Sequence, residues 1–263
     1  MYTETEGIIF KQIKTVNSRR MILLFSKKYG KISAGTAISE RSRGKSALSM
    51  RPFTYGKYEL YKNRDSYNIN GAEVYRSYYR IGEDVEKYMA ASYVLEFTER
   101  ILTENDPAPE LFVLLVDFFD MVETRKKRYG TLVIAYLLKS LAACGHMPHL
   151  DSCVSCGSAE NLDFFDIREG GLLCRHCRRS KEGSGTDKKV EKINAIEQND
   201  RLLYEVNFGI INILRYFLKN PLKRLERLAL DEEAEQRLSA ILKSYMEYHL
   251  DIRDLKSERF ILD

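Results

Sequence analysis

Cys153-Val154-Ser155-Cys156 and Cys174-Arg175-His176-Cys177 are two CxxC pairs, and seventeen residues separate them. Two cysteines at i and i+3 can hold one metal ion from a single tight turn, and two such pairs supply the four thiolates of a tetrahedral zinc site. Gly157, directly after the first pair, suits the positive φ at which such a turn ends. Apolar runs at 164–167 and 171–173 predict two short strands joined by a turn. The stretch therefore predicts a zinc ribbon, in which one structural zinc is bound by Cys153, Cys156, Cys174 and Cys177.

Other roles for these cysteines fit less well. A redox CxxC needs only one pair near a strand-to-helix junction, and inert core cysteines would not occur as two pairs with the same spacing. Catalytic zinc needs an open coordination position, which four thiolates do not leave, and none of the four histidines begins the His-x-Glu of a zinc deaminase. We expect His146, His149 and His176 to be loop residues. The predicted zinc holds the fold together and marks no reaction centre.

Length and composition indicate a soluble chain of about two domains, with 263 residues, 44% hydrophobic and 30% charged. The first ten residues carry two glutamates and no basic segment, so they do not resemble a signal peptide. The longest apolar stretch, 111–119, is too short to span a membrane. Because five cysteines cannot all pair as disulfides, we expect a reducing cytoplasm.

The net charge of +4 conceals an uneven distribution along the chain. Residues 1–80 contain 16 Lys and Arg against 6 Asp and Glu, a net charge of +10, and the other 183 residues carry 26 against 32, a net charge of −6. A concentrated positive region is typical of a protein that binds a polyanion, most often nucleic acid.

The basic N-terminal region has the pattern of a small β-barrel. Five short runs rich in Ile, Phe, Tyr and Leu, separated by turn residues, predict strands at 5–13, 20–26, 30–38, 54–61 and 66–71. Five strands that close on themselves match an OB-fold in number and size. An SH3-like barrel has the same periodicity, so the pattern alone does not separate the two.

Cations in this region lie in and beside the predicted turns. The segment 39–46 contains three of them and no apolar residue, so it can follow phosphates. Nine of the seventeen tyrosines also lie in residues 1–80, and a tyrosine ring can stack on an unpaired base. For Phe53, Tyr55, Tyr58 and Tyr61, which lie along or beside one strand, the barrel core or sheet face is the more common role. The predicted DNA-binding residues are Arg19, Arg20, Lys27, Lys28, Lys31, Arg41, Arg43, Lys45 and Arg51.

No catalytic residue is predicted anywhere in the chain. Gly44-Lys45-Ser46 looks like the end of a phosphate-binding P-loop, but the motif requires glycine at the position of Ser39. No nucleophile elbow, dinucleotide glycine motif or acidic metal cluster occurs elsewhere. The sequence therefore favours a protein that is not an enzyme.

After Ile81 the apolar period becomes helical. Helices are predicted from Asp84 to about 104, from Pro107 or Pro109 to 128, from a cap at Thr131 to about 145, from about 199 to 220, and from 231 to 250. The basic cluster 125–128 would then lie in a last helical turn and complement the helix dipole, although a nucleic-acid patch stays open. Residues 182–187 have the composition of a flexible linker.

This pattern predicts an α+β multidomain protein, with an OB-fold barrel followed by an all-α domain into which the zinc ribbon is inserted. The predicted domains are 1–80, the OB-fold; 81–150, the first part of the helical domain; 151–181, the zinc module; and 182–263, the linker and the second part of the helical domain.

Several motifs together resemble a known family. They are Gly145-His146-Met147-Pro148-His149-Leu150-Asp151-Ser152-Cys153-Val154-Ser155-Cys156-Gly157, the second cysteine pair, and the tail from Tyr248-His249-Leu250 to Leu255-Lys256-Ser257-Glu258-Arg259-Phe260. With the basic barrel before them, they resemble the bacterial DNA repair protein RecO family over the whole chain. The resemblance implies a recombination mediator that binds single- and double-stranded DNA and anneals complementary strands. It also implies that the chain joins RecR and helps load the RecA recombinase onto DNA coated by single-strand-binding protein.

Two other functions fit the sequence less well. A zinc-containing, DNA-binding transcription regulator would need an element that reads base edges in the major groove, and no helix-turn-helix pattern accompanies the basic region. A zinc-dependent enzyme that modifies nucleic acid would need an open metal site and a general base, and neither is found. Because some members of the resembled family lack the four cysteines, the resemblance implies that zinc is not the seat of the shared activity.

Overall fold

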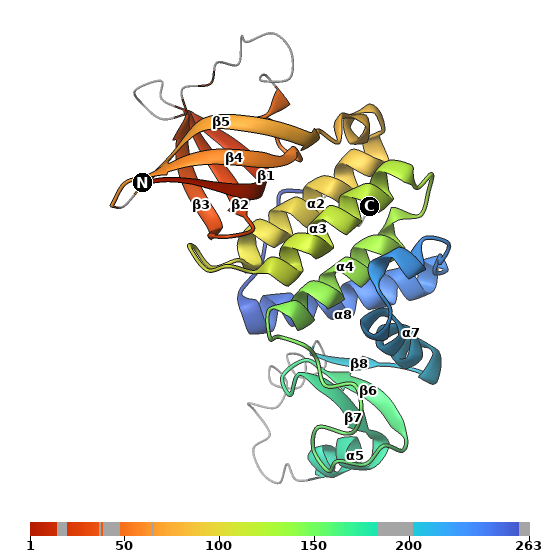
Figure 1. Cartoon of the computed structure of the whole chain (residues 1–263). Helices are drawn as coiled ribbons and strands as arrows, with labels where there is room; N and C mark the ends of the chain where they lie inside the picture. Colours follow the sequence, from red (N-terminus) through yellow and green to blue (C-terminus); the bar gives the residue numbers. More distant parts are fainter. Residues whose placement is uncertain (15–19, 37, 39–47, 65, 184–201, 258–263) are drawn as a thin grey trace. The chain divides into compact units, whose positions relative to one another are not determined.

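The computed structural model of the chain describes all residues except 15–19, 37, 39–47, 65, 184–201 and 258–263 (Figure 1). The chain divides into two compact units. Unit 1 contains Met1–Tyr129 and returns at Asp254–Asp263, and unit 2 is Gly130–Arg253.

Five strands of unit 1 form a closed barrel in the order β1-β2-β3-β5-β4, drawn in red to orange in Figure 1. They are β1 (Tyr2–Lys14), β2 (Arg20–Ser26), β3 (Gly30–Thr36), β4 (Tyr55–Lys62) and β5 (Tyr67–Arg76). All pairings are antiparallel except β3 with β5, which run parallel over three residue pairs. Because β5 lies between β3 and β4, the barrel has a Greek-key crossover, as an OB-fold does. The predicted OB-fold is confirmed. The strand order decides between the OB-fold and the SH3-like barrel, which the periodicity of the sequence did not separate.

Strand β1 belongs to both sides of the barrel. Its first half pairs with β4 and its second half with β2, and the register shifts between Ile9 and Lys11 where the strand bends. Inside the barrel, side chains from all five strands form one apolar core, including Ile9, Ile22, Leu24, Ile32, Tyr58 and Ile69. The Tyr58 ring is fully buried and its hydroxyl donates to the Ser49 carbonyl at 2.9 Å. Tyr58 is therefore a core residue, as its position along the strand predicted.

The predicted strand bounds hold within three residues, except at the end of β5. The strand was expected to end at Gly71 but continues to Arg76. Gly71 pairs with Glu59 on β4, and a Cβ at this position would lie 2.5 Å from a Glu59 carboxylate oxygen. The glycine therefore makes room for a neighbouring side chain and does not mark a turn.

Unit 1 continues with a 3-10 turn η1 (Tyr79–Glu83) and helices α2 (Val85–Ile101) and α3 (Pro109–Thr124). Asp84 caps α2 as predicted, because its side chain accepts from the Lys87 amide at 3.1 Å. The predicted end of α3 at 128 is wrong. The backbone becomes extended at Arg125. The Thr124 hydroxyl donates to the carbonyl oxygens of Asp120 and Met121, each at 3.2 Å. The basic cluster 125–128 thus follows α3 and does not form its last turn.

Gly30 and the loop after α2 meet at the turn between β2 and β3. Gly30 has φ +69°, and a Cβ there would lie 2.0 Å from the Asp106 carbonyl oxygen. The Asn105 amide donates to the Lys31 carbonyl at 3.0 Å, so the loop and the hairpin share backbone contacts. Only a glycine allows this close approach.

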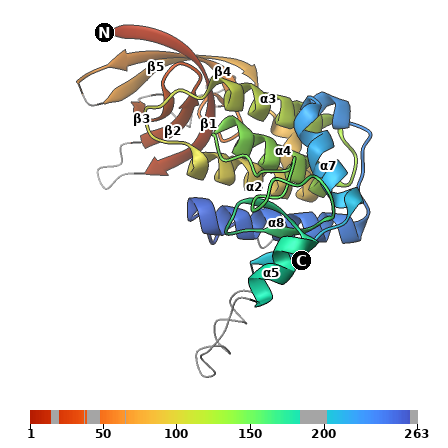
Figure 2. The ribbon, with the colours of Figure 1, turned by 90° about the horizontal axis from the view of Figure 1, so that it is seen from below.

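Unit 2 is a helical unit with a small sheet inserted into it; the strands of the sheet are labelled in Figure 1, and Figure 2 shows the helices from below. Its elements are α4 (Tyr129–Ala143, of which all but the first residue lie in this unit), β6 (Leu162–Asp166), β7 (Gly171–Cys174), α5 (Arg175–Gly183), β8 (Leu203–Glu205), α7 (Phe208–Lys219), a 3-10 turn η2 (Leu222–Leu225) and α8 (Glu232–Leu250). The ribbon follows α4 and precedes α7, which confirms the predicted insertion.

Two helix starts in unit 2 differ from the prediction. Thr131 does not cap α4, which begins two residues earlier. Its hydroxyl bonds Glu235 and accepts from the Leu230 amide at 3.0 Å, so it joins α4 to the segment that leads into α8. The helix predicted from 199 begins only at Phe208, after an Asn207 cap, because residues 203–205 pair with β6 as a third ribbon strand. Asp231 caps α8 as predicted.

Within the described part of the chain, no helix is both long enough and apolar enough to cross a membrane. The predicted linker 182–187 lies outside the described residues from position 184 onward, and its first two residues belong to the end of α5.

Candidate metal centre and nucleic-acid interface

The four predicted ligands meet at one point of the ribbon. The sulfur atoms of Cys153, Cys156, Cys174 and Cys177 all lie within 4.8 Å of one another. Cys153 and Cys156 come from the turn before β6, whereas Cys174 ends β7 and Cys177 lies in the first turn of α5. The sheet register brings the pairs together, since Leu162, shortly after the first pair, is the β6 partner of Cys174.

Backbone amides hold the sulfur atoms in place. The Cys174 amide donates to Cys153 Sγ at 3.3 Å, and the Cys177 amide donates to Cys174 Sγ at 3.4 Å. Gly157 has the predicted positive φ, +76°, and its amide donates to the Cys153 carbonyl at 2.8 Å. Burial acts against ionisation of Cys153, but amides of Cys174, Cys156 and Ser155 donate to its sulfur and lower its pKa overall. At Cys153 these bonds therefore favour the thiolate, which is the form that binds metal.

The distances fit a tetrahedral metal centre. Cys156 Sγ and Cys174 Sγ are 3.7 Å apart. Zn–S bonds of about 2.3 Å at tetrahedral angles place two sulfur atoms about 3.8 Å apart, whereas a disulfide requires about 2.05 Å. Three of the four cysteines are buried and Cys156 is exposed. The donor set is that of a closed structural site, and it leaves no position for a substrate.

Histidines near the cysteines have other contacts. His176 was expected in a loop but lies in the first turn of α5. His149 forms a bridge to Gly171 at the edge of the ribbon, and its ring bonds the Ser152 hydroxyl at 2.8 Å. Neither belongs to the metal cluster formed by the described residues.

The ribbon is attached to the helices of unit 2 by polar contacts. The Tyr204 hydroxyl on β8 lies 2.5 Å from the Ser244 hydroxyl on α8, and the His249 ring lies 2.6 Å from the Ile167 carbonyl. Arg215 on α7 donates to the Leu150 carbonyl at 2.6 and 2.9 Å, just before the first cysteine pair. Loss of metal would therefore disturb α7 and α8 as well as the ribbon.

The nine predicted DNA-binding residues divide into two groups. Arg19, Arg41, Arg43 and Lys45 lie outside the described residues. The other five are described: Arg20, Lys27, Lys28, Lys31 and Arg51. Arg20 begins β2 opposite Thr36, Lys28 lies in the turn between β2 and β3, and Arg51 is exposed shortly before β4.

Lys27 and Lys31 have partners within unit 1. Lys27 Nζ donates to a Glu6 carboxylate oxygen at 2.8 Å and lies 6.0 Å from the Phe112 ring centre on α3. Lys31 Nζ donates to the Glu99 carbonyl near the end of α2 at 2.9 Å. These two cations therefore stabilise the contact between the barrel and the helices that follow it.

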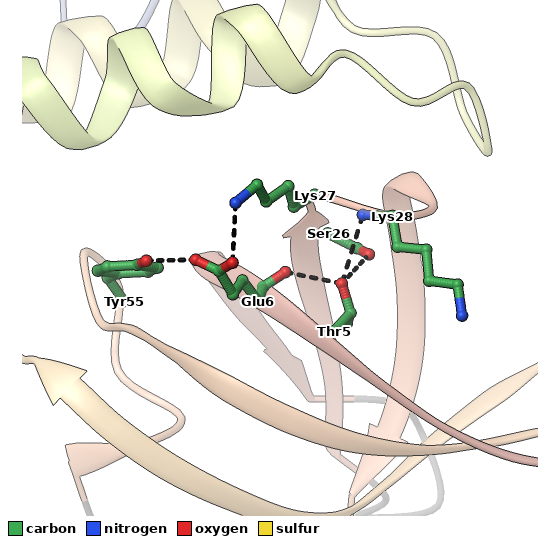
Figure 3. A network of polar contacts seen from close by, with 6 residues as sticks. All are labelled: Thr5, Glu6, Ser26, Lys27, Lys28 and Tyr55. Atoms are coloured by element: carbon green, nitrogen blue, oxygen red, sulfur yellow. Dashed lines mark hydrogen bonds and ion pairs between the residues drawn. The ribbon is translucent and has the colours of Figure 1, made fainter.

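Figure 3 shows the network to which Lys27 belongs. The Tyr55 hydroxyl donates to the second Glu6 oxygen, while Thr5 Oγ1 donates to the Glu6 carbonyl and bonds Ser26 Oγ, each at 2.8 Å. Bonds from Lys27 and Tyr55 hold the pKa of Glu6 below its usual value, and burial together with Glu6 raises the pKa of Tyr55. Glu6 lies in a strand with Glu4, Lys11 and Lys14 and belongs to no recognisable motif, so this role could not be predicted from the sequence.

The C-terminal tail motif also has a structural partner in unit 1. The Glu96 carboxylate on α2 accepts from the amides of Lys256 and Ser257, each at 3.0 Å, and from the Ser257 hydroxyl at 2.6 Å. These bonds lower the pKa of Glu96 although burial opposes them. The tail is thus fixed to the unit that contains the barrel.

Comparison with known proteins connects these features to a family. The model described as "Recombination protein O N terminal" matches residues 1–78, and "Recombination protein O C terminal" matches 82–188 and 197–259. The chain belongs to the RecO family. The "DNA repair protein RecO" of Alkaliphilus metalliredigens is 29% identical over 252 residues, which cover 95% of each chain. Its counterpart from Caldanaerobacter subterraneus is 28% identical and covers 99% of this chain and 98% of its own length. Family membership assigns the chain to DNA repair and recombination.

The RecO N-terminal match coincides with the OB-fold barrel, and the C-terminal match contains the helices, the four cysteines and the tail motif up to Arg259. The OB-fold is a common scaffold for binding single strands. The barrel is therefore the part of this RecO-family chain in which a nucleic-acid interface is to be sought.

We expect one zinc ion per chain and a loosened ribbon when it is lost. Replacing Cys153 and Cys174 together by serine removes two of four ligands, so the variant should retain less than a tenth of a zinc equivalent and melt at a lower temperature. Elemental analysis and thermal unfolding measure the two effects. Cys144→Ser is the matched control, because Cys144 is the one cysteine outside the cluster. A folded wild-type chain without stoichiometric zinc would contradict the expectation.

Proposed function

We propose that this chain is a non-enzymatic recombination mediator that binds single- and double-stranded DNA and anneals complementary strands. The observation that carries the proposal is that the segment with a net charge of +10 folds as an OB-fold barrel. A positively charged barrel can track a phosphate backbone while its aromatic residues tolerate any base. The family assignment to DNA repair supports the same reading.

Annealing by such a surface requires no chemistry. Two complementary strands repel each other through their phosphates, and cations that replace counterions along one strand lower that repulsion. Base pairing then supplies both specificity and driving force. Nucleotide hydrolysis is not needed, in agreement with a sequence that lacks a complete P-loop.

We propose that phosphate contacts come mainly from the predicted cations other than Lys27 and Lys31. The candidates are Arg19, Arg20, Lys28, Arg41, Arg43, Lys45 and Arg51. Lys27 and Lys31 were predicted with them but bond Glu6 and Glu99, so their removal would alter the fold of unit 1 as well as its charge. The cluster 125–128 is a second candidate surface, since it follows α3.

The proposed partners are RecR, single-strand-binding protein and, indirectly, RecA, which the chain would help to load. For the acidic tail of single-strand-binding protein, a groove of about 460 Å³ in unit 1 is the best candidate. Phe10, Phe53 and Tyr88 give it an apolar wall. Its cations outnumber its acids by four to two, namely Lys11, Lys31, Arg100 and Lys256 against Glu96 and Glu99.

We infer that the metal is a single structural zinc and that the chain acts in the bacterial cytoplasm at the nucleoid. Four thiolates suit zinc and leave no site for a bound water. Because the metal site and the barrel belong to different units, DNA binding should depend little on zinc.

A zinc-containing transcription regulator is the alternative function. It would read base edges in the major groove and prefer one sequence by a large factor. A barrel that binds through phosphates and stacking predicts little sequence preference. Competition between unrelated oligonucleotides of equal length separates the two.

We expect the purified chain to speed the annealing of labelled complementary strands without ATP and to leave ATP intact. Annealing should persist when the strands are coated with single-strand-binding protein. Fluorescence quenching between labelled strands measures annealing, and phosphate release measures hydrolysis. Failure to anneal naked strands at low salt would contradict the mediator function, and ATPase activity abolished by a point mutation in this chain would contradict the non-enzymatic one.

Affinity for single-stranded DNA should fall steeply with salt. Replacing Arg41, Arg43 and Lys45 by alanine should lower the magnitude of the logarithmic salt slope by about two, at roughly 0.7 per phosphate contact. Fluorescence anisotropy at several salt concentrations gives the slope. The matched control replaces Lys126, Lys127 and Arg128 and removes the same charge. If only the control changes the slope, the phosphate contacts lie after α3 and not in the barrel.

A further inference from the structure

A row of residues crosses the outer surface of the barrel at the end where β4 passes into β5. In the sheet register Tyr2 on β1 pairs with Tyr61 on β4, Tyr61 pairs with Asn68 on β5, and Asn68 pairs with Gly35 on β3. Cross-strand partners point to the same side of a sheet. The row therefore presents two aromatic rings, an amide and a residue without a side chain on one continuous surface.

An open groove of about 550 Å³ follows this row. Besides the four residues of the row it is lined by Thr36, Ile38, Ile69 and Asn70. Its volume lies within the range of about 300–1,000 Å³ that is usual for small-ligand sites. Gly35 allows the groove to form, because a Cβ at this position would lie 2.8 Å from Asn68 Oδ1.

The aromatic end of the groove is built to meet a flat ligand. The rings of Tyr2 and Tyr61 meet edge to face, with centres 4.9 Å apart and planes at 60°. This contact fixes the tilt of Tyr2, yet 74% of the residue stays exposed. Exposing the apolar surface of this ring to water is unfavourable. A flat ligand stacked on the ring would cover that surface and remove the cost.

The polar end of the groove is formed by the side chains of Asn68 and Asn70. Asn70 is the extra residue of a β-bulge, where the β4–β5 register shifts, and bulges commonly redirect a side chain next to a binding site. The side-chain amides of Asn68 and Asn70 make no hydrogen bond to any described residue. An amide offers both a donor and an acceptor, which is the combination found on base edges.

The charge around the groove comes from the N-terminal segment as a whole. None of the residues that line the groove is acidic. Lys62 follows Tyr61 and therefore points to the other side of β4, where its ammonium lies 5.4 Å from the Tyr67 ring centre. Glu4 and Glu59 are the next pair on the face of Tyr2 and Tyr61, and Glu4 forms an ion pair with Lys57. Residues 1–80 together carry a net charge of +10, and an aromatic platform on a positively charged barrel is the arrangement with which proteins hold single-stranded nucleic acid.

We propose that this groove binds an unpaired nucleobase of a DNA strand, with Tyr2 and Tyr61 as the stacking platform and Asn68 and Asn70 as hydrogen-bonding partners. The inference rests on the proposed DNA-binding function and adds to it a site that contacts bases, distinct from the phosphate contacts. Bases become available to such a groove only where the duplex is open. The groove therefore gives the chain a preference for single strands over duplex.

The test separates bases from phosphates. Fluorescence anisotropy measures the affinity for an oligothymidine and for an abasic strand of the same length and charge. Replacing Tyr2 and Tyr61 by alanine should weaken binding of the oligothymidine by about tenfold or more, since stacking contributes about 1–3 kcal/mol per base. Affinity for the abasic strand should stay within twofold. Phenylalanine at both positions should preserve binding, and Tyr79→Ala, which removes a tyrosine that is 61% exposed outside the groove, should change neither affinity.

A reporter variant gives a second readout that does not depend on weakened binding. The chain contains no tryptophan, so Tyr2→Trp places a unique fluorophore in the groove. Oligothymidine should quench it and the abasic strand should not. The assignment is overturned if the wild type binds oligothymidine and the alanine variant binds it equally, or if a partner protein and not DNA quenches the tryptophan. A wild type that binds neither strand overturns the proposed function, and the groove assignment with it.

Discussion

The pairing of β1 with two neighbours is the constraint on which the rest of unit 1 depends. The strand pairs with β4 along its first half and with β2 along its second, so it must bend, and the bend closes the barrel. Closure removes the free edges of the sheet and directs one set of side chains into the core. Glu6 lies just before the bend, where Lys27 and Tyr55 hold its carboxylate. Tyr2 at the start of the same strand faces outward, beside Tyr61.

Elements and sites that depend on contacts within a short stretch of chain were predicted from the sequence, and those that depend on distant residues were not. The four-cysteine cluster was predictable because two CxxC turns and a short hairpin fix its members within 25 residues of chain. Caps at Asp84 and Asp231 were predictable for the same reason, since each side chain bonds an amide three residues later. Thr131 is also a residue type that commonly caps helices, but it bonds Leu230 and Glu235, about a hundred residues away. No local pattern contains that information.

Long-range pairing explains the remaining differences. Periodicity gave five strands but not the parallel contact of β3 with β5 that distinguishes the OB-fold. Strand β8 is three residues long and is defined only by its pairing with β6. Its residues were therefore predicted as the start of a helix. Lys27 and Lys31 were predicted to bind DNA from their charge alone. Their partners, Glu6 on β1 and the Glu99 carbonyl on α2, depend on how these elements pack in three dimensions. The groove row joins positions 2, 35, 61 and 68, which share no sequence motif.

Different parts of the chain have different proposed tasks. In the proposed function the barrel contacts DNA, through phosphates at its loops and through bases at the groove. The four-cysteine cluster joins the two ends of the ribbon, and polar contacts of Tyr204, His249 and Arg215 attach the ribbon to α7 and α8. Photo-crosslinking of single-stranded DNA that carries photoreactive bases, followed by peptide mapping, tests this division most directly. The account predicts crosslinks within residues 1–80, with Tyr2 or Tyr61 among the modified positions. Crosslinks confined to residues 130–253, with none in the barrel, would contradict it.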